Sequence, residues 1–319
     1  MPPRGSRVDV TRIHLDTDLG SDTDDLCALA MVLGWPDAEL VGVTTSTDPG
    51  GRRAGLVAYA LELAGRSDVP FAAGAEGSIG GLFEPLAFPD YWPKPIAPRP
   101  WSAGAALELL ESNARAGAVI VAVGPYTNLA MLEAARPGLL ASAGVAVMGG
   151  HHTTPRDGLP PWGMRDDFNV QQDAVAASIV FRRCDPIVVP LAVSLEVCVR
   201  GRQLHALRDA GALGALIAAQ AERHARDQRR DRLPASFPGL PSDLLNFQYD
   251  PLACAVALGW DGVTVERVPC SFEREDDGLL RMERREGGVP LRTAVAVDAE
   301  RFERKWLEAV CAASARRSS

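Results

Sequence analysis

The sequence lacks closely spaced cysteines. Its six cysteines are scattered over 319 residues, form no Cys-x-x-Cys motif, and mostly lie inside apolar runs such as ACAVAL around Cys254. This pattern argues against a disulfide framework or a cysteine-based zinc site. It is typical of reduced core cysteines, so we expect a cytoplasmic protein.

Long hydrophobic runs and an excess of positive charge are also missing. No segment approaches the roughly twenty apolar residues that a membrane helix needs, and the first ten residues, MPPRGSRVDV, hold no apolar stretch suited to a signal peptide. The net charge of -8 argues against a surface that follows nucleic-acid phosphates or anionic lipid. We therefore expect a small soluble ligand as the partner, with no nucleic acid and no membrane.

Short β-rich runs alternate with segments rich in Ala and Leu. Apolar runs without strict alternation are typical of strands covered on both faces. We therefore predict an α/β fold with a doubly wound, mostly parallel sheet and helices on both faces, in a single domain over residues 1–319 with tails at about 1–10 and 313–319. The expected strands are 13–16, 40–45, 71–73, 119–123, 145–148 and 187–192, and the expected helices are 24–34, 52–64, 103–116, 128–135 and 173–183.

Three segments break this alternation. Residues 76–100 and 151–168 are dense in Pro, Gly and aromatic residues, and long loops of this kind are more often functional than accidental. Residues 218–248 begin as a charged helix and end in a Pro-rich loop. For this segment a solvated helix with its connection and a cover over a site are both open.

An aspartate cluster near the N-terminus is the most informative feature. The run RIHLDTDLGSDTDDLCALAMVLG predicts a buried strand, a glycine-containing turn and a helix that begins near Asp24. Helix capping explains one or two of the carboxylates, but five within ten residues repel one another unless a cation neutralises them. Carboxylates without paired His or Cys suit calcium or magnesium rather than zinc. The cluster is Asp16, Asp18, Asp22, Asp24 and Asp25.

Three other strand ends carry polar residues. They are the runs TTSTDP at 44–49, GPYTN at 124–128 and MGGHH at 148–152. Ligands of open α/β sheets bind at the carboxyl ends of the strands, which is where the aspartate loop also lies. We therefore expect these segments to border one site.

Six motifs in order resemble the inosine-uridine-preferring nucleoside hydrolase family. They are the DTD and DD run, VGVTT, GPYTN, MGG, DFN at 167–169 and YDPLA at 249–253, and the resemblance extends from about Ile13 to about Asp298. It implies calcium-dependent hydrolysis of the N-glycosidic bond of a ribonucleoside or related N-riboside to free base and ribose. It also implies a homodimer or homotetramer.

The resemblance implies a metal set. Asp18 matches a calcium ligand that also takes the proton from the attacking water. Asp25 and the late Asp250 match further ligands, and Val123 would offer a backbone carbonyl.

The resemblance also implies contacts to the sugar. Asp24 matches a residue that contacts a ribose hydroxyl, and Asp167 and Asn169, with Phe168 between them, fall where the family binds ribose hydroxyls. The loop reads DTDLGSDTDD in place of the shorter DxDPGxDD, so Asp22 is a second candidate for the role of Asp24.

Other departures affect the leaving group. Tyr249 stands where many members carry a His that activates the leaving group; tyrosine is a weaker acid but can stack on a base or hydrogen-bond to it. His151 and His152 are substitutes that we do not favour. Asp48, shifted by one residue from a family position, is a further candidate ribose contact. Tryptophans in or beside the Pro-rich loops that are candidates for stacking on a base are Trp92, Trp101 and Trp162.

Two alternatives stay open. A haloacid-dehalogenase-like phosphatase with magnesium would also carry an Asp-x-Asp motif after a strand. A non-catalytic relative would bind calcium and ribose without turnover. The sequence leaves the base, the nature of the sugar and the choice between Asp22 and Asp24 undecided.

Overall fold

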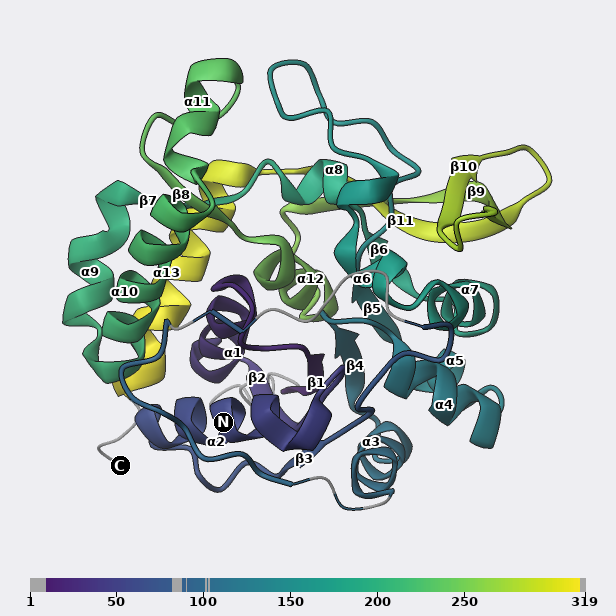
Figure 1. Cartoon of the computed structure of the whole chain (residues 1–319), viewed down its shortest axis with the longest axis horizontal. Helices are drawn as coiled ribbons and strands as arrows, with labels where there is room; N and C mark the ends of the chain where they lie inside the picture. Colours follow the sequence, from purple (N-terminus) through teal and green to yellow (C-terminus); the bar gives the residue numbers. More distant parts are fainter. Residues whose placement is uncertain (1–9, 82–87, 90, 101, 103, 316–319) are drawn as a thin grey trace, which may run out of the picture.

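A nine-stranded sheet forms the centre of the computed structural model, which describes residues 10–81, 88–89, 91–100, 102 and 104–315 (Figure 1). Its strands are β1 (Thr11–Thr17), β2 (Ala38–Thr45), β3 (Phe71–Ala73), β4 (Val119–Ala122), β5 (Val145–Met148), β6 (Ile187–Val189), β9 (Val263–Arg274), β10 (Leu280–Arg284) and β11 (Val289–Val297). The order across the sheet is β10-β9-β11-β6-β5-β4-β1-β2-β3. All neighbours from β11 to β3 are parallel, whereas β9 runs antiparallel to β10 and β11.

The strand order reverses beside β1. The chain runs outward from β1 through β2 to β3, and then resumes on the other side of β1 with β4, β5 and β6. In the register, Asp16 of β1 pairs with Thr44 of β2 and with Ala122 of β4. The loops that follow β1 and β4 therefore meet at the switch point where open α/β sheets bind their ligands.

Helices cover both faces of the sheet. Neighbouring residues of β4 point to opposite sides, with Val121 in one hydrophobic cluster and Ile120 in the other. The first cluster includes residues of α1, α2, α10, α12 and α13, and the second includes residues of α3, α4 and α7. The helices are α1 (Asp24–Gly34), α2 (Arg52–Leu63), α3 (Ala105–Arg115), α4 (Thr127–Ala135), α5 (Leu139–Ala143), α6 (Phe168–Gln172), α7 (Ala174–Arg183), α8 (Leu191–Ser194), α9 (Leu204–Asp209), α10 (Gly211–Asp227), α11 (Leu233–Ser236), α12 (Tyr249–Ala257) and α13 (Ala299–Ala315).

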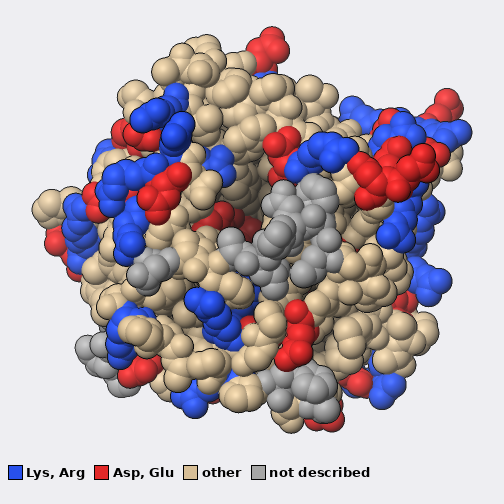
Figure 2. Space-filling view, viewed as in Figure 1, with Lys and Arg blue, Asp and Glu red and all other residues tan. Residues whose placement is uncertain are grey.

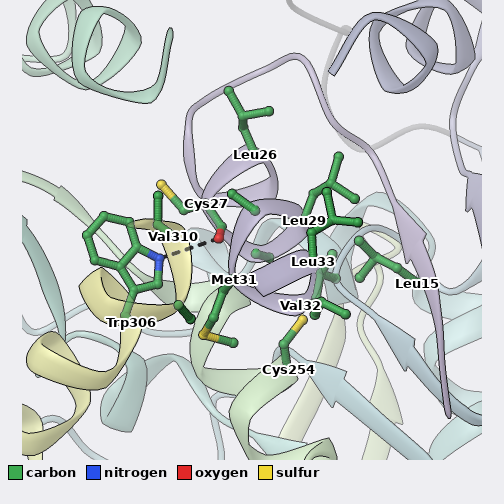
Figure 3. Packing of buried hydrophobic residues seen from close by; sticks show 14 of the residues in the cluster. Leu15, Leu26, Cys27, Leu29, Met31, Val32, Leu33, Cys254, Trp306 and Val310 are labelled. Carbon is green, nitrogen blue, oxygen red and sulfur yellow. Dashed lines mark hydrogen bonds between the residues drawn. The ribbon is translucent and has the colours of Figure 1, made fainter. Parts of the chain in front are cut away.

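Helix α1 is an inner helix, since each of its residues is buried. Helix α13 packs across it: the Trp306 indole donates a hydrogen bond of 3.4 Å to the Cys27 carbonyl (Figure 3). A Cβ added at Gly34 would lie 1.8 Å from the Ala309 carbonyl oxygen, so the close approach of the two helices requires glycine there. This packing fixes the position of the α1 N-terminus, which carries the aspartate pair.

The predicted doubly wound α/β fold is confirmed. Five of the six expected strands agree with the structure to within two residues, but the expected strand 187–192 ends at Val189. Pro190 follows, and helix α8 begins at Leu191. The expected C-terminal tail from 313 is also wrong at its start, because α13 continues to Ala315 and Ala313 is buried.

Five strands were not expected. Strands β9, β10 and β11 form an antiparallel extension, and a separate pair, β7 (Cys198–Arg200) and β8 (Leu244–Phe247), lies outside the main sheet. All six cysteines are free, and all but Cys311 are buried, in agreement with the expectation of reduced core residues. Within the described residues, no helix has the length and apolar character that crossing a membrane requires.

Candidate active site

A cavity of about 420 Å³ opens at the carboxyl ends of the parallel strands. Asp18 after β1, Val123 after β4 and Met148 at the end of β5 border it. Of the segments that we expected to share a site, the aspartate loop and 148–152 therefore do so, whereas the lining residues include none from 44–49 or 124–128. Figure 2 shows a hollow on the face drawn, with acidic atoms inside it. Seven aspartates and two arginines are among the described residues that line the cavity.

Three aspartates of the loop after β1 lie close together. Asp22, Asp24 and Asp25 each offer a carboxylate oxygen within 4.8 Å of the others. The Asp22 side chain accepts a hydrogen bond of 3.1 Å from the Asp24 N–H, which fixes the turn into α1. Burial, and then the charges of Asp18 and Asp22, raise the pKa of Asp25 well above its ordinary value. A cation would relieve this repulsion.

Asp18 has a buried arginine beside it. Arg53 of α2 is fully buried, and its Nη2 lies 3.7 Å from the Asp18 carboxylate while its Nε donates to the Thr47 carbonyl at 3.0 Å. Burial raises the pKa of Asp18 to about 6, Arg53 opposes that rise and Asp22 adds to it. The sequence analysis missed Arg53, because it occurs as the second of two arginines at the start of an ordinary Ala-rich helix.

The late aspartate lines the same cavity, although it is not in the group formed by Asp22, Asp24 and Asp25. Asp250, in the first turn of α12, is 3% exposed, and its pKa is raised by burial and then by Asp25, Asp22 and Asp18. The Val123 carbonyl accepts a hydrogen bond of 2.8 Å from the Asn169 amide, and a second lone pair of this oxygen remains available. Buried, mutually repelling carboxylates with a backbone carbonyl are the oxygen donors that a hard divalent cation prefers. The residues present thus fit such a metal.

The DFN segment lines the cavity as expected. Oδ2 of Asp167 accepts from the Gly150 N–H at 2.8 Å and from His151 Nδ1 at 3.0 Å. The Met282 N–H donates to His151 Nε2 at 3.0 Å, so the imidazole proton is on Nδ1 and is donated to Asp167. Oδ1 of Asp167 is buried and has no partner among the described residues, so it is available to a ligand.

Asp48 is not brought to the cavity. Its carboxylate is fully buried and accepts hydrogen bonds from the Arg53 N–H at 2.6 Å, the Ala54 N–H at 2.9 Å and the Thr45 hydroxyl at 2.7 Å. These bonds satisfy backbone donors at the start of α2. The expected ribose contact at Asp48 is thus replaced by a helix-capping role.

Asp16 and the buried His14 form a polar chain behind the cavity. Thr44 and Asn128 both donate to Oδ1 of Asp16. Because the Thr44 hydroxyl proton goes to Asp16, His14 Nε2 donates to Thr44, and His14 Nδ1 accepts from the Asn113 amide at 2.9 Å. Burial lowers the pKa of His14 to about 3, consistent with a neutral ring.

Aromatic side chains also line the cavity; we call Trp162, Phe168 and Tyr249 the aromatic group. The Phe247 ring lies between Tyr249 and Trp162, with its centroid 5.4 Å from the centroid of either ring. The Arg230 guanidinium lies 4.8 Å from the Trp162 ring centroid. The expectation for Trp162 therefore fits the geometry. Trp92 instead packs against Tyr59, and Trp101 lies outside the described residues.

The segment 218–248 contributes to the cavity. His224 and Gln228 at the end of α10, and Arg230 at the start of the 3-10 turn η4 (Arg230–Arg232), are among its lining residues. Of the two interpretations left open for this segment, the one in which it covers the site is confirmed.

The strand order and the oxygen-rich cavity define an α/β protein with an acidic site at its topological switch point. The family model described as inosine-uridine preferring nucleoside hydrolase matches residues 13–304, and the chain belongs to this family. Membership sets aside the phosphatase alternative, which is a different family.

Curated relatives share part of this chain. The pyrimidine-specific ribonucleoside hydrolase RihA of Salmonella paratyphi C (strain RKS4594) is 32% identical over 215 residues, which cover 62% of this chain and 66% of that protein. The match thus spans slightly less than two thirds of the relative's length.

Solved structures share the fold over nearly the whole chain. A plant nucleoside hydrolase, the PpNRh1 enzyme, superposes with a TM-score of 0.76 at 22% identity, covering 94% of this chain and 99% of that one. The purine-preferring ribonucleoside hydrolase from Gardnerella vaginalis gives a TM-score of 0.74 at 21% identity, covering 96% and 100%. Because pyrimidine-specific and purine-preferring proteins both resemble this chain, the comparisons leave the base open.

Proposed function

We propose that this protein is a calcium-dependent hydrolase that cleaves the N-glycosidic bond of a ribonucleoside or related N-riboside to free base and ribose. The proposal rests on the cavity at the β1–β4 switch point, which Asp18, Asp25, Asp250 and Val123 line and where oxygens of Asp22, Asp24 and Asp25 lie within 4.8 Å of one another. Family membership supports the reaction class. Calcium held there would supply positive charge that orients a ribose diol and lowers the pKa of a water.

Different residues have different roles in the proposed reaction. Asp18, with a pKa of about 6, is largely ionised at neutral pH and accepts the proton of the attacking water. The unpartnered oxygen of Asp167 and the carboxylate of Asp24 or Asp22 accept hydrogen bonds from ribose hydroxyls. Nearby carboxylates favour the positive charge that develops on the ribosyl group as the C–N bond breaks.

The experiment is an incubation with a panel of purine, pyrimidine and modified nucleosides. We expect base and ribose to be released in equal amounts from at least one substrate. If calcium and ribose bind without any turnover, the protein is instead a non-catalytic relative. A cytoplasmic location and a homodimeric or homotetrameric assembly remain predictions, and the assembly is measured by light scattering on the purified chain.

A further inference from the structure

His224 is a buried imidazole without a hydrogen-bond partner in the cavity. It lies in the last turn of α10, is 4% exposed and lines the cavity. In the described part of the chain, neither its Nδ1 nor its Nε2 has a partner. A buried polar group left unpaired costs roughly 1–3 kcal/mol. An unpaired ring facing a ligand cavity therefore indicates a partner that arrives with the ligand.

The surroundings hold this ring in place. Tyr91 meets it edge to face, with ring centroids 6.0 Å apart and an interplanar angle of 80°. Burial lowers the pKa of His224; Asp22 and Asp227 oppose this lowering and Arg230 adds to it. The ring is thus fixed by packing, and its nitrogens remain free for a ligand.

The other histidines have different roles. Both ring nitrogens of His151 are used, by Asp167 and by the Met282 N–H. His152 is hydrogen-bonded to Thr293 at 3.0 Å and does not line the cavity, and the side chain of His205 is 90% exposed. His14 belongs to the polar chain behind β1. All five histidines of the sequence are described, so His224 is the one imidazole that is free to act in the cavity.

Tyr249 does not replace an imidazole as a proton donor. It lines the cavity. Burial raises the pKa of its hydroxyl, which makes tyrosine a still weaker acid than in water. Its contacts with Phe247 are those of an aromatic packing residue.

We propose that His224 donates a proton to the departing base, an inference that rests on the hydrolase function proposed above. The oxygen of water forms a bond to the anomeric carbon, the C–N bond breaks and its electron pair goes to the base. The protonated imidazole gives a proton to a ring nitrogen or an exocyclic oxygen of the base and becomes neutral. The water proton goes to Asp18 and then to solvent, from which His224 recovers a proton. The net reaction is N-riboside plus water to ribose plus the neutral free base.

The substrate class follows from this role. The base is a heterocycle with a proton-accepting atom on its edge, stacked against an aromatic group. Trp162 and Tyr249, which line the same cavity, supply that aromatic surface. A leaving group that is stable as an anion does not need the proton from His224.

The test compares two substrates in wild type and His224→Ala. One is a natural nucleoside that the wild type cleaves, and the other is 4-nitrophenyl β-D-ribofuranoside, whose leaving group departs as a stable anion. We expect kcat on the nucleoside to fall about 10²- to 10⁴-fold, the usual contribution of a general acid, with KM changed by less than about threefold. The rate on the nitrophenyl riboside should change by less than about threefold.

Controls separate a chemical role from a structural one. His224→Gln keeps a hydrogen-bond donor but transfers no proton, so kcat on the nucleoside should again fall while KM stays near the wild-type value. His205→Ala, a change on the surface of α9, should leave both rates unchanged. Equal losses on both substrates, or no loss on the nucleoside, would overturn the role of His224 alone. A wild-type protein that cleaves neither substrate would overturn the proposed function and this inference with it.

Discussion

The two halves of the cavity are built in different ways. The metal half consists of residues that directly follow strands or begin inner helices, such as Asp18 after β1, which has an ion pair with Arg53, and Asp25 in α1, which accepts a hydrogen bond from Thr17. The leaving-group half consists of Trp162 in a loop and of His224 and Arg230 near the end of a helix, and atoms of the latter two have no partner in the described structure. Under the proposed function, residues held by the sheet and its inner helices act on the part common to all N-ribosides, while peripheral segments face the base, which varies.

Asp18→Asn tests the metal half and has the largest expected effect. Asparagine cannot take a proton from water, so kcat should fall by about 10³- to 10⁴-fold. The loss should be the same for every base, because the change leaves the leaving-group half intact. Steady-state kinetics on a purine and a pyrimidine nucleoside measure it. A loss that differs strongly between the two bases would break the division into halves.

Replacing one arginine from each half compares how much each half contributes to the free energy of unfolding. Arg53→Met removes a fully buried cation and leaves the Asp18 carboxylate without it, which should cost about 3–5 kcal/mol of unfolding free energy. Arg230→Met, at the edge of the aromatic group, should cost less than about 1 kcal/mol. Urea unfolding of both variants provides the values. Equal losses would mean that the leaving-group half is as rigidly built as the metal half.

Trp162→Ala tests the aromatic group. Stacking of a base on an aromatic ring contributes about 1–3 kcal/mol, so KM should rise by about 5- to 150-fold on nucleosides. The rise should depend on the base, in contrast to the effect of Asp18→Asn. Trp92→Ala is the matched control, because Trp92 packs on Tyr59 and does not line the cavity. A KM that is unchanged in Trp162→Ala would place the base elsewhere.

His152 makes the free energy of unfolding depend on pH. Its folded-state pKa is lowered to about 4, mainly by burial, from 6.5. Between these values the unfolded state binds more protons, so this group removes stability as pH falls below 6.5. At pH 5 the loss is about 2 kcal/mol relative to pH 7. His152→Asn should flatten this part of the pH profile in chemical unfolding, and an unchanged slope would contradict it.

The sequence predicted the metal half because its signals are local. The bounds of α1 follow from the carboxylates at its start and the apolar run behind them, and the carboxyl ends of β1 and β4 follow from short apolar strands. Asp48 misled the prediction, although an aspartate shortly before a helix is itself a capping signal. Its predicted ribose contact came from the resemblance to the family. In the structure its carboxylate instead accepts hydrogen bonds from the Arg53 and Ala54 N–H groups.

The leaving-group half was harder to predict because its burial is tertiary. The run AERHARDQRR reads as a solvated helix, yet Tyr91 and the cavity enclose His224, and Arg230 faces Trp162. The antiparallel strands β9 and β10 were missed for a related reason. β10 is the edge strand and β9 lies next to it; both carry many exposed charged residues, so no apolar run marks them.

The most direct measurement of the central claim is the rate of base release before calcium removal, after chelation, and after calcium is restored. We predict turnover in the first state, loss of turnover with chelator and full recovery with calcium, accompanied by a calcium-induced rise in melting temperature. Hydrolysis that continues unchanged in excess chelator would contradict the account.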